Sequence, residues 1–583
     1  MHLSAIAGRQ RPRPRTWLTL LPLLALGSIA AAVSLVAAAD PNLPRLEKRG
    51  AATQLIVDGK PFLILGGETA NTASSSLDYM EEVWPRLAKM HLNTALVAIG
   101  WNWIEPEEGR FDFTLVDGML RQARAHDMRV VIVWFGSWKN GLSSFAPAWV
   151  KRDQRRFPRV RIKSGKSVEI LSAFSDASRD ADARALAALL RHVRERDPQH
   201  TVIMVQVENE VGILGDARDR LPVADAAFAQ RVPAELIARV RSESAWPELR
   251  KLWQDAGAKT SGTWAEVFGA TPAADEVFQA WHYARYVDHV AAAGKAELPV
   301  PFFTNTWIVQ PEDKGPGDYP SGGPEPLTLD VWRVGAPHID FNAPDIYLPN
   351  FAEWCARFHR ADNPLFVPES RGDASGVANA FYAIGAHAAI GYSPFGIDNT
   401  GRVPQVAPGA AQSQPQPTDV GDLPLSRGYA LLRSMTPAIL DAQSRGAIAA
   451  VTLNADRQRQ DVALGDYTLT VDLRRNRRNP TQVPALGYAL IVQAGADEYY
   501  VAGMDVQVTF ASRKETDAIV GFASAEAGAF VNGAWKPGRD MNGDDILLRY
   551  DLAAAAEQNQ SGSGLRFAGP YPSLQHVTLY RYR

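Results

Sequence analysis

The chain has 583 residues, of which 46% are hydrophobic and 21% charged, and its formal net charge is −3. These values are typical of a soluble globular protein that is long enough for more than one domain. The near balance of charges gives no sign of the basic excess expected of a nucleic-acid-binding protein. A single cysteine, Cys355, excludes an internal disulfide, so bridges carry no information about the redox state of the compartment.

Residues 1–39 have the pattern of an export signal. Four arginines lie between positions 9 and 15, the stretch 17–36 is apolar and uncharged, and Ala37-Ala38-Ala39 offers small residues for cleavage. A retained membrane anchor is the alternative, because the apolar stretch is long enough to span a bilayer. In either case we expect the rest of the chain to be exported and to lie in the periplasm, at the cell surface or outside the cell. We expect no stable membrane insertion once the signal has been cleaved.

Residues 40–440 predict a (β/α)₈ barrel. Apolar runs that read as buried strands alternate with helical patterns at 77–91, 115–126 and 180–196, which is typical of βαβ units around a parallel sheet. The predicted strands lie at 62–65, 94–99, 130–134, 202–207, 300–304, 339–343, 365–367 and 389–395. Two long polar insertions, 310–326 and 401–422, are expected to be loops over one face of the barrel.

Residues 441–583 have a different sequence pattern, which predicts a C-terminal antiparallel β-sandwich. Short alternating runs occur at 467–473, 489–492, 506–510 and 577–580, and Asn532-Gly533 is a strong two-residue hairpin signal. The acidic cluster Asp540, Asn542, Asp544 and Asp545 allows a calcium loop as an alternative, but its spacing lacks the remaining ligands and favours a polar turn. The sequence therefore predicts neither a metal site nor a cofactor.

Two glutamates follow predicted strands at the same end of the barrel. Glu210 ends the fourth strand, directly after Asn209, and Glu369 follows the seventh. Catalytic groups of such barrels lie where the strands end, so both carboxyls are expected to face one pocket. A retaining glycosidase needs two such carboxyls, one as proton donor and one as nucleophile. Taken singly, each residue has a simpler interpretation as a helix cap or a salt-bridge partner.

The segment Trp101-Asn102-Trp103-Ile104-Glu105-Pro106-Glu107-Glu108-Gly109-Arg110-Phe111-Asp112-Phe113 resembles a segment of glycoside hydrolase family 35 β-galactosidases. The start Gly66-Gly67-Glu68, the segment 134–140 and the β-rich tail are similar to an exported bacterial branch of that family. Some members of this branch are similar to enzymes that trim galactose from xyloglucan side chains. The resemblance extends from about residue 55 to the end of the chain.

The resemblance implies roles for individual residues. Glu210 would be the general acid/base and Glu369 the nucleophile, while Asn209 would bind the sugar 2-hydroxyl. Glu105 would bind hydroxyls on the far side of galactose, and Tyr347 would hold an oxygen of the nucleophile. Candidate walls or hydroxyl contacts are Trp134, Trp138, Asn140 and Trp307, although capping of the barrel core explains Trp138 and Trp307 equally well.

The chain departs from more familiar family members after the first strand. Those members have a tyrosine-containing segment at a position where this sequence has Gly67-Glu68-Thr69-Ala70-Asn71. Glu68 or Asn71 is therefore the candidate replacement for the missing galactose contact. We also expect one carboxyl of the pair to stay protonated in apolar surroundings, and the other to stay ionised beside a cation such as Arg371.

The sequence thus predicts an exo-acting retaining β-galactosidase for plant cell-wall oligosaccharides such as xyloglucan side chains. Two alternatives remain: a related glycosidase with another preference, such as β-glucosidase or α-L-arabinosidase, and a carbohydrate-binding barrel without catalysis. The expected partner is an oligosaccharide rather than nucleic acid. The oligomeric state and the role of the C-terminal domain do not follow from the sequence.

Overall fold

The computed structural model describes residues 40–400, 419–474, 483–546 and 563–583. Residues Pro41–Arg583 form one compact unit. The predicted export signal at 1–39 lies outside the described residues, as does most of the polar insertion at 401–422. Within the described ranges, no helix is both long enough and apolar enough to cross a membrane.

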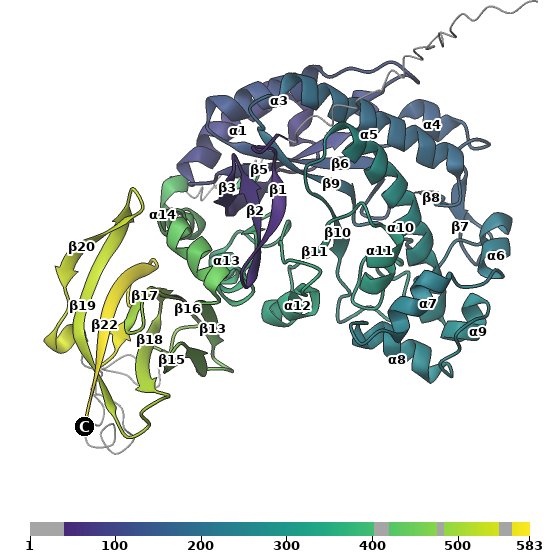
Figure 1. The fold of residues 1–583 in the computed structure, drawn as a ribbon. Coiled ribbons are helices and arrows are strands. Elements are labelled where there is room, and N and C mark those ends of the chain that lie inside the picture. Colours follow the sequence, from purple (N-terminus) through teal and green to yellow (C-terminus); the bar gives the residue numbers. More distant parts are fainter. Residues whose placement is uncertain (1–39, 401–418, 475–482, 547–562) are drawn as a thin grey trace, which may run out of the picture. The chain divides into compact units, whose positions relative to one another are not determined.

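The first part of the chain forms a curled parallel sheet wrapped by helices (Figure 1). Seven strands follow one another in the order β11-β10-β9-β6-β5-β4-β12. Their bounds are β4 (Ile64–Glu68), β5 (Thr94–Gly100), β6 (Arg129–Lys139), β9 (Val202–Asn209), β10 (Phe302–Trp307), β11 (Phe341–Asp345) and β12 (Gly391–Tyr392).

Segment 365–370 completes the ring between β11 and β12. The backbone amide of Ile346 donates to the carbonyl of Glu369 at 3.0 Å, and the amide of Ser393 donates to the carbonyl of Val367 at 2.9 Å. Both contacts belong to parallel bridges, and β12 pairs in parallel with β4. Eight parallel segments therefore close on themselves, which gives a TIM-barrel-like fold.

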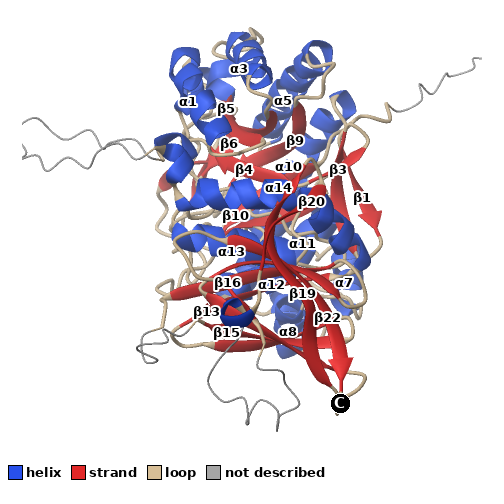
Figure 2. Ribbon diagram, turned by 90° about the vertical axis from the view of Figure 1, so that its left-hand side faces the viewer, coloured by secondary structure: helices blue, strands red, loops and turns tan. Residues whose placement is uncertain are grey.

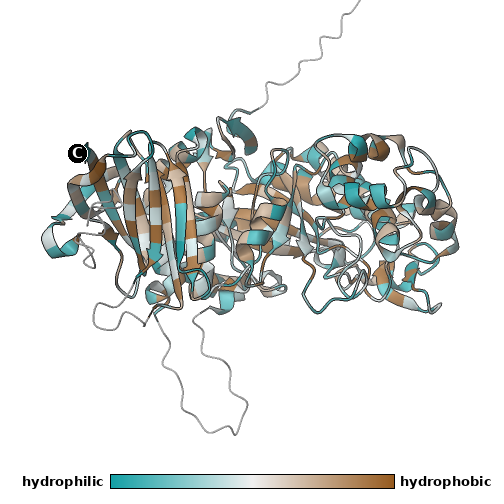
Figure 3. Cartoon of the chain, turned by 90° about the horizontal axis from the view of Figure 1, so that it is seen from below, coloured by the Kyte–Doolittle hydropathy of each residue, from teal (hydrophilic) through white to brown (hydrophobic). Residues whose placement is uncertain are grey.

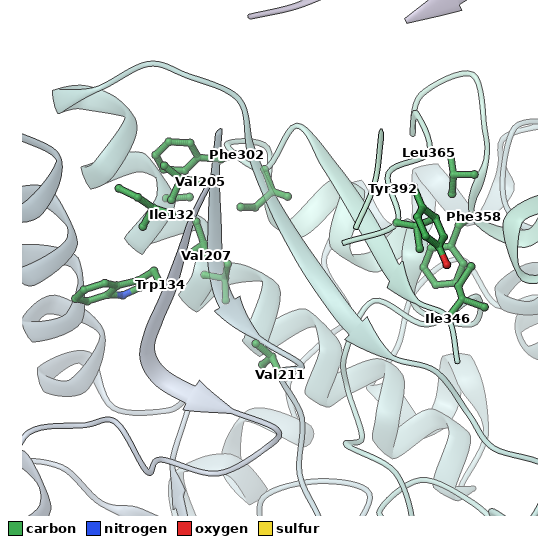
Figure 4. Packing of buried hydrophobic residues seen from close by; sticks show 14 of the residues in the cluster. Ile132, Trp134, Val205, Val207, Val211, Phe302, Ile346, Phe358, Leu365 and Tyr392 are labelled. Carbon is green, nitrogen blue, oxygen red and sulfur yellow. The ribbon is translucent and has the colours of Figure 1, made fainter. Parts of the chain in front are cut away.

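Alternation along the strands divides the barrel core into two layers. In β5, Leu96 and Ala98 belong to an inner cluster, while Ala95 and Val97 belong to an outer cluster shared with the helices. Successive side chains of a strand point to opposite faces, so continuous apolar runs fill the interior and the helix interface together. Figure 4 shows part of the outer cluster, including Ile132 and Val205.

The helices predicted around the barrel are present. They are α1 (Leu77–Lys89), α3 (Thr114–Ala125) and α5 (Asp176–Arg196). The side chain of Ser76 accepts a hydrogen bond from the amide of Tyr79 and caps α1, and that of Ser175 caps α5 in the same way. Further helices of the barrel region are α2 (Trp101–Ile104), α4 (Ala148–Arg152), α11 (Leu329–Gly335), α12 (Phe351–Phe358), α13 (Ala374–Ala386) and α14 (Pro424–Arg445).

The connection between β9 and β10 is helical, a feature that the sequence analysis did not predict. It contains α6 (Pro222–Phe228), α7 (Ala234–Arg241), α8 (Pro247–Asp255), α9 (Trp264–Phe268) and α10 (Pro272–Glu297). Small accessory strands are β1 (Arg45–Arg49), β2 (Ala52–Val57), β3 (Lys60–Phe62), β7 (Arg159–Arg161) and β8 (Ser167–Leu171). Leu55 and Val57 of β2 join the inner cluster of the barrel.

The C-terminal part consists of two antiparallel sheets. One has the order β13 (Ile448–Asn454), β16 (Leu486–Gln493), β17 (Glu498–Met504), β22 (Ser573–Tyr582), β19 (Ile519–Val531) and β20 (Ala534–Asp540). The other has the order β14 (Arg459–Leu464), β15 (Tyr467–Leu473), β18 (Val506–Ser512) and β21 (Leu565–Arg566).

Both C-terminal sheets contribute to one buried cluster, for example through Ile491 of β16 and Leu469 of β15. Their strands alternate between hydrophobic and hydrophilic residues, visible as bands in Figure 3. The Asn532-Gly533 turn joins β19 to β20 with φ values of 51° and 78°, as a two-residue hairpin requires. The side chain of Asn542 accepts from the amide of Gly543, so this acidic segment is organised as a local turn.

Helices α13 and α14 contact the C-terminal strands β13 and β16 (Figure 2). Phe381 of α13 and Tyr488 of β16 meet edge to face, with ring centroids 5.0 Å apart. Tyr488 and Leu490 belong to the same buried cluster as the outer layer of the barrel. The C-terminal sheets are therefore packed on the barrel through a continuous apolar interface.

Candidate active site

Glu210 and Glu369 lie together at the carboxyl ends of their strands. One oxygen from each, with one from Asp345, lie within 4.8 Å of one another. All three carboxyls line a cavity of about 560 Å³, a size typical of small-molecule sites. Glu210 and Glu369 are only 5% and 4% exposed. The structure therefore brings the two predicted catalytic carboxyls into one small, largely dehydrated pocket.

Three side chains donate hydrogen bonds to Glu369. Asn209 and Asn305 approach Oε1 through their amide nitrogens at 3.2 Å and 3.3 Å, and the hydroxyl of Tyr347 approaches Oε2 at 2.9 Å. Donors aimed at both oxygens stabilise the ionised form and fix the orientation of the carboxylate. Tyr347 thus makes the contact that the sequence analysis expected.

Glu210 has different surroundings. Its backbone amide donates to Oδ1 of Asn305 at 3.0 Å, and the side-chain amide of Asn140 donates to its carboxyl. Burial, followed by the negative charge of Glu369, raises the pKa of Glu210 to about 8, while Lys139 acts in the opposite direction. At neutral pH the pocket therefore pairs a protonated carboxyl with a carboxyl held by three donors.

The end of β9 has an unusual backbone. Glu208 and Glu210 have φ values of 63° and 45°, in the left-handed region that residues other than glycine seldom adopt. This conformation separates the two glutamates: the carboxyl of Glu208 accepts from the amide of Trp138 at 2.7 Å and does not line the cavity. The selection of Glu210 over Glu208 from the sequence thus agrees with the geometry.

Two further carboxyls approach the pair. Asp345 accepts from the amide nitrogen of Asn305 at 2.7 Å through Oδ2, while its Oδ1 has no partner among the described residues. Glu68 is completely buried, and neither of its oxygens has a partner within the described chain. Burial, followed by the charge of Glu369, raises the pKa of both groups well above the ordinary range.

The cation near these acids is Lys139 rather than the expected Arg371. Its Nζ donates to Oδ1 of Asn209 at 2.9 Å, and its charge opposes the upward pKa shifts of Glu68 and Glu210. Arg371 instead donates through Nε to the carbonyl of Tyr347. Lys139, Asn305 and Asp345 were not singled out from the sequence, although each is a polar residue at the end of a barrel strand, which was the available signal.

Other sequence candidates divide into two groups. Asn71, Asn140 and Trp307 line the cavity, and Oδ1 of Asn71 lacks a partner within the described residues. Trp138 does not line it: this ring is buried against Tyr283 and Tyr286, and its indole N–H donates to the carbonyl of Leu171. Trp138 therefore belongs to the core rather than to the wall of the cavity.

Glu105 and Trp134 also lie outside the lining of the cavity. The carboxyl of Glu105 accepts from the indole of Trp101 at 2.8 Å and from the amide of Gly109 at 2.7 Å, so it organises its own loop. The indole of Trp134 donates to Asp182 at 2.8 Å within the core. Glu105 is 2% exposed, so the structure does not place it at the galactose contact that the resemblance implies.

The grouping of Glu210, Asp345 and Glu369 would also fit three ligand atoms around a metal ion. The hydrogen bonds favour another use. N–H and O–H groups point at both oxygens of Glu369, and a cation bound there would face these donor hydrogens. The arrangement is better suited to proton transfer and nucleophilic attack by carboxyls.

Comparison with known proteins finds similarity to β-galactosidases over part of the chain. Residues 74–248 match the glycoside hydrolase family 42 model, described as β-galactosidase, and residues 425–551 match a domain of unknown function, DUF5597. A β-galactosidase from Xanthomonas manihotis is 30% identical over 205 residues, which cover 34% of this chain and 31% of that protein. The match thus spans less than a third of that relative's length.

Solved structures of two β-galactosidases also align with the chain. The enzyme from Bacillus circulans sp. alkalophilus has a TM-score of 0.43 and 16% identity, covering 65% of this chain and 57% of that chain. The enzyme from Rahnella sp. R3 has a TM-score of 0.44 and 17% identity, with the same coverage. The segment 101–113, which resembles family 35, lies inside the range matched by family 42. The chain is therefore similar to β-galactosidases over residues 74–248 and over the 205 residues aligned with the curated relative.

Proposed function

We propose that the protein is an exo-acting, retaining β-galactosidase that releases terminal β-D-galactose from plant cell-wall oligosaccharides such as xyloglucan side chains. The observation that carries the proposal is that one carboxyl oxygen of Glu210 and one of Glu369 lie within 4.8 Å of each other in one cavity. Retaining glycosidases hold their carboxyls roughly 5–5.5 Å apart, whereas inverting enzymes need about 6.5–9.5 Å to admit a water molecule. The short separation favours direct attack by a carboxylate.

In the first step Glu369 attacks the anomeric carbon while the bond to the leaving oxygen breaks. Glu210 gives its proton to that oxygen, so the leaving group departs as an alcohol and galactose remains bound as an ester of Glu369. In the second step water attacks the anomeric carbon, Glu210 takes its proton, and the ester bond to Glu369 breaks. The pair returns to its initial protonation state.

The electrostatics of the pair support this exchange of roles. The charge of Glu369 is the second cause of the raised pKa of Glu210, after burial. When Glu369 becomes an ester its charge disappears, so the pKa of Glu210 falls and the group is ready to accept a proton. Asn209, fixed by Lys139, lies against Glu369 at a position suited to binding a hydroxyl beside the anomeric carbon.

The same proposal includes the family, the cellular location, the C-terminal fold and the residues that contact the sugar. The segment 101–113 supports membership of family 35, and residues 1–39 support export to the periplasm or cell surface. The two C-terminal sheets with their shared cluster support a β-sandwich. Asn71, Asn140 and Trp307 are proposed to contact the sugar, because they line the cavity around the pair.

The experiment is a substrate panel followed by product analysis. Nitrophenyl β-galactoside is compared with the corresponding β-glucoside and α-L-arabinoside, and lactose with galactosylated xyloglucan oligosaccharides. The proposal expects the galactoside to give the highest kcat/KM and proton NMR to detect β-galactose as the first product. A higher value for another sugar supports the related glycosidases, and sugar binding without turnover of any glycoside supports the non-catalytic alternative.

A further inference from the structure

A second cavity adjoins the catalytic pocket. It has a volume of about 350 Å³ and shares Gln310 with the catalytic cavity as a lining residue. Leu348, which directly follows Tyr347, lines the second cavity as well. The loop after β10 and the loop after β11 therefore border both spaces, and both loops leave the carboxyl ends of barrel strands.

The walls of this second cavity contain polar groups without partners. Glu325 is 2% exposed, and apart from the backbone amide of Val309, which lies near its carboxyl, its oxygens have no hydrogen-bond partner among the described residues. Trp354 is 4% exposed, and its indole N–H is also without a partner in the described part of the chain. Unpaired buried polar groups are costly, so their presence at a cavity indicates a site where a ligand or water supplies the missing bonds.

A second buried acid lies behind Glu325. Glu276 is 1% exposed and accepts from the hydroxyl of Tyr319 at 2.9 Å. Burial raises the pKa of Glu276 to about 7, and burial followed by the charge of Glu276 raises that of Glu325 well above the ordinary range. Glu325 therefore favours its protonated form more than an ordinary carboxyl does, and a protonated carboxyl both donates and accepts hydrogen bonds, as a sugar hydroxyl requires.

Charge around the cavity selects against ions. An anion would lie beside Glu248 and beside Glu276, whose pKa of about 7 leaves it partly ionised at neutral pH. A cation would face the guanidinium of Arg357, which lies 4.5 Å from the ring centre of Trp354 and pairs with Glu248 at 3.1 Å. An aromatic wall beside neutral hydroxyl-binding groups fits a neutral carbohydrate.

We infer that the cavity lined by Glu325, Trp354 and Gln310 is a second carbohydrate-binding subsite, which takes the part of the oligosaccharide from which galactose is removed. Its role on the leaving-group side rests on the proposed galactosidase function, whereas its binding of a neutral oligosaccharide does not. Because the terminal galactose fills the catalytic cavity, the remainder of the chain must extend through its mouth, and the shared residue Gln310 marks that path.

The test begins with binding, which requires no turnover. A xyloglucan oligosaccharide without galactose is titrated calorimetrically into the full chain in the presence of excess galactose. We expect Leu327→Trp, which fills the cavity, and Glu325→Leu, which removes hydrogen bonding, to raise Kd at least tenfold. Glu325→Gln should stay within twofold of wild type, because the amide replaces a neutral carboxyl, and Trp354→Phe should raise Kd about fivefold.

Trp264→Phe is the matched control, because Trp264 is also a buried ring but packs on Phe268 and Phe278 away from this cavity. Its Kd should not change, and thermal melting checks that each variant folds. No binding to the wild type, or equal Kd values for wild type, Leu327→Trp and Glu325→Leu, would overturn the inference.

Kinetics separate this inference from the proposed function. For Leu327→Trp and Glu325→Leu, kcat/KM should fall at least tenfold on a galactosylated xyloglucan oligosaccharide and less than twofold on nitrophenyl β-galactoside. Equal losses on both substrates would contradict a leaving-group subsite. A wild type that binds the galactose-free oligosaccharide through this cavity but hydrolyses no galactoside would refute the proposed function and leave the binding site in place.

Discussion

Two pairs of buried carboxyls lie on either side of the end of β9. Glu210 and Glu369 face the catalytic cavity, whereas Glu208 and Asp182 lie in the core, where Ser137 and Trp134 donate to Asp182. Burial is the leading cause of the raised pKa of Glu210, Glu208 and Asp182. A raised pKa therefore does not by itself identify a catalytic acid; access to a cavity and a separately stabilised partner distinguish the first pair.

Replacement of the nucleophile should have the largest effect. Glu369→Gln keeps the shape of the side chain, but it removes the attacking carboxylate and replaces one acceptor oxygen with an amide nitrogen that cannot accept a hydrogen bond. We expect kcat on nitrophenyl β-galactoside to fall by roughly 10³-fold or more. The matched change in the core pair, Glu208→Gln, should leave kcat within about threefold, and a comparable loss there would remove the functional distinction between the pairs.

Glu210→Gln should have the next largest effect, and its size should depend on the substrate. General acid catalysis contributes about 10²–10⁴-fold, and a good leaving group needs little of it. We expect a loss of that order on lactose and a much smaller loss in the first step on dinitrophenyl β-galactoside. Pre-steady-state measurement of dinitrophenol release tests this, and equal losses on both substrates would argue against Glu210 as the proton donor.

The pH dependence of kcat/KM should report the loss of the proton from Glu210. Its pKa lies at about 8, so the proton needed by the leaving group is present at neutral pH and is lost as the pH rises through that value. We expect kcat/KM to fall about tenfold per pH unit above pH 8 on lactose. The decline should be absent in the first step with dinitrophenyl β-galactoside, and an unchanged decline there would assign it to another group.

The core pair should instead affect stability. The pKa of Glu208 is raised in the folded state, so the unfolded chain loses this proton at lower pH than the folded chain does. The unfolded state is therefore favoured increasingly as the pH rises above about 4.3 towards the folded-state pKa. Glu208→Gln removes this dependence, so we expect its stability relative to wild type to improve steadily as the pH rises from 5 to 8.

Chemical unfolding of wild type and Glu208→Gln across that pH range measures the difference. A constant difference between the two proteins would mean that Glu208 ionises normally in the fold. Asp182→Asn is a useful companion, because Asp182 accepts hydrogen bonds from Ser137 and Trp134 that an amide satisfies only in part. It should lower stability and also reduce the pH slope, because the pKa of Asp182 is itself raised and its charge contributes to the raised pKa of Glu208.

The sequence predicted the parts of this molecule that local pattern controls. Strands such as β5 and β9 are continuous apolar runs, so their positions were predicted within a few residues. The helices between β9 and β10 were missed, partly because α10 is buried on most of its surface and lacks a clear apolar face. The strand before Glu369 was predicted correctly in place, but it pairs through isolated bridges instead of an extended ladder.

The active site shows the same difference between features that local sequence pattern controls and features that tertiary contacts control. Glu210 and Glu369 could be placed because each follows a predicted strand, whereas the role of Tyr347 came from the family resemblance. The contacts of Glu105 and Trp138 could not be predicted, since they depend on which neighbours fold against them: Gly109 and Trp101 satisfy Glu105, and Leu171 satisfies Trp138. For a side chain in a loop after a strand, the sequence indicates at which end of the barrel it lies but not in which direction it points.

The two tryptophans Trp138 and Trp307 give the smallest predicted effect and test that point directly. Trp307 is partly exposed at the end of β10 and lines the cavity, whereas Trp138 is buried and bonded to Leu171. Trp307→Phe should raise KM about three- to tenfold without a change in melting temperature, because it alters only a sugar contact. Trp138→Phe should cost about 1 kcal/mol of stability through the lost hydrogen bond and leave KM unchanged. If Trp138→Phe raised KM while Trp307→Phe did not, the cavity would not be the galactose site, and the wall of the pocket would have to be sought on the other side of β6.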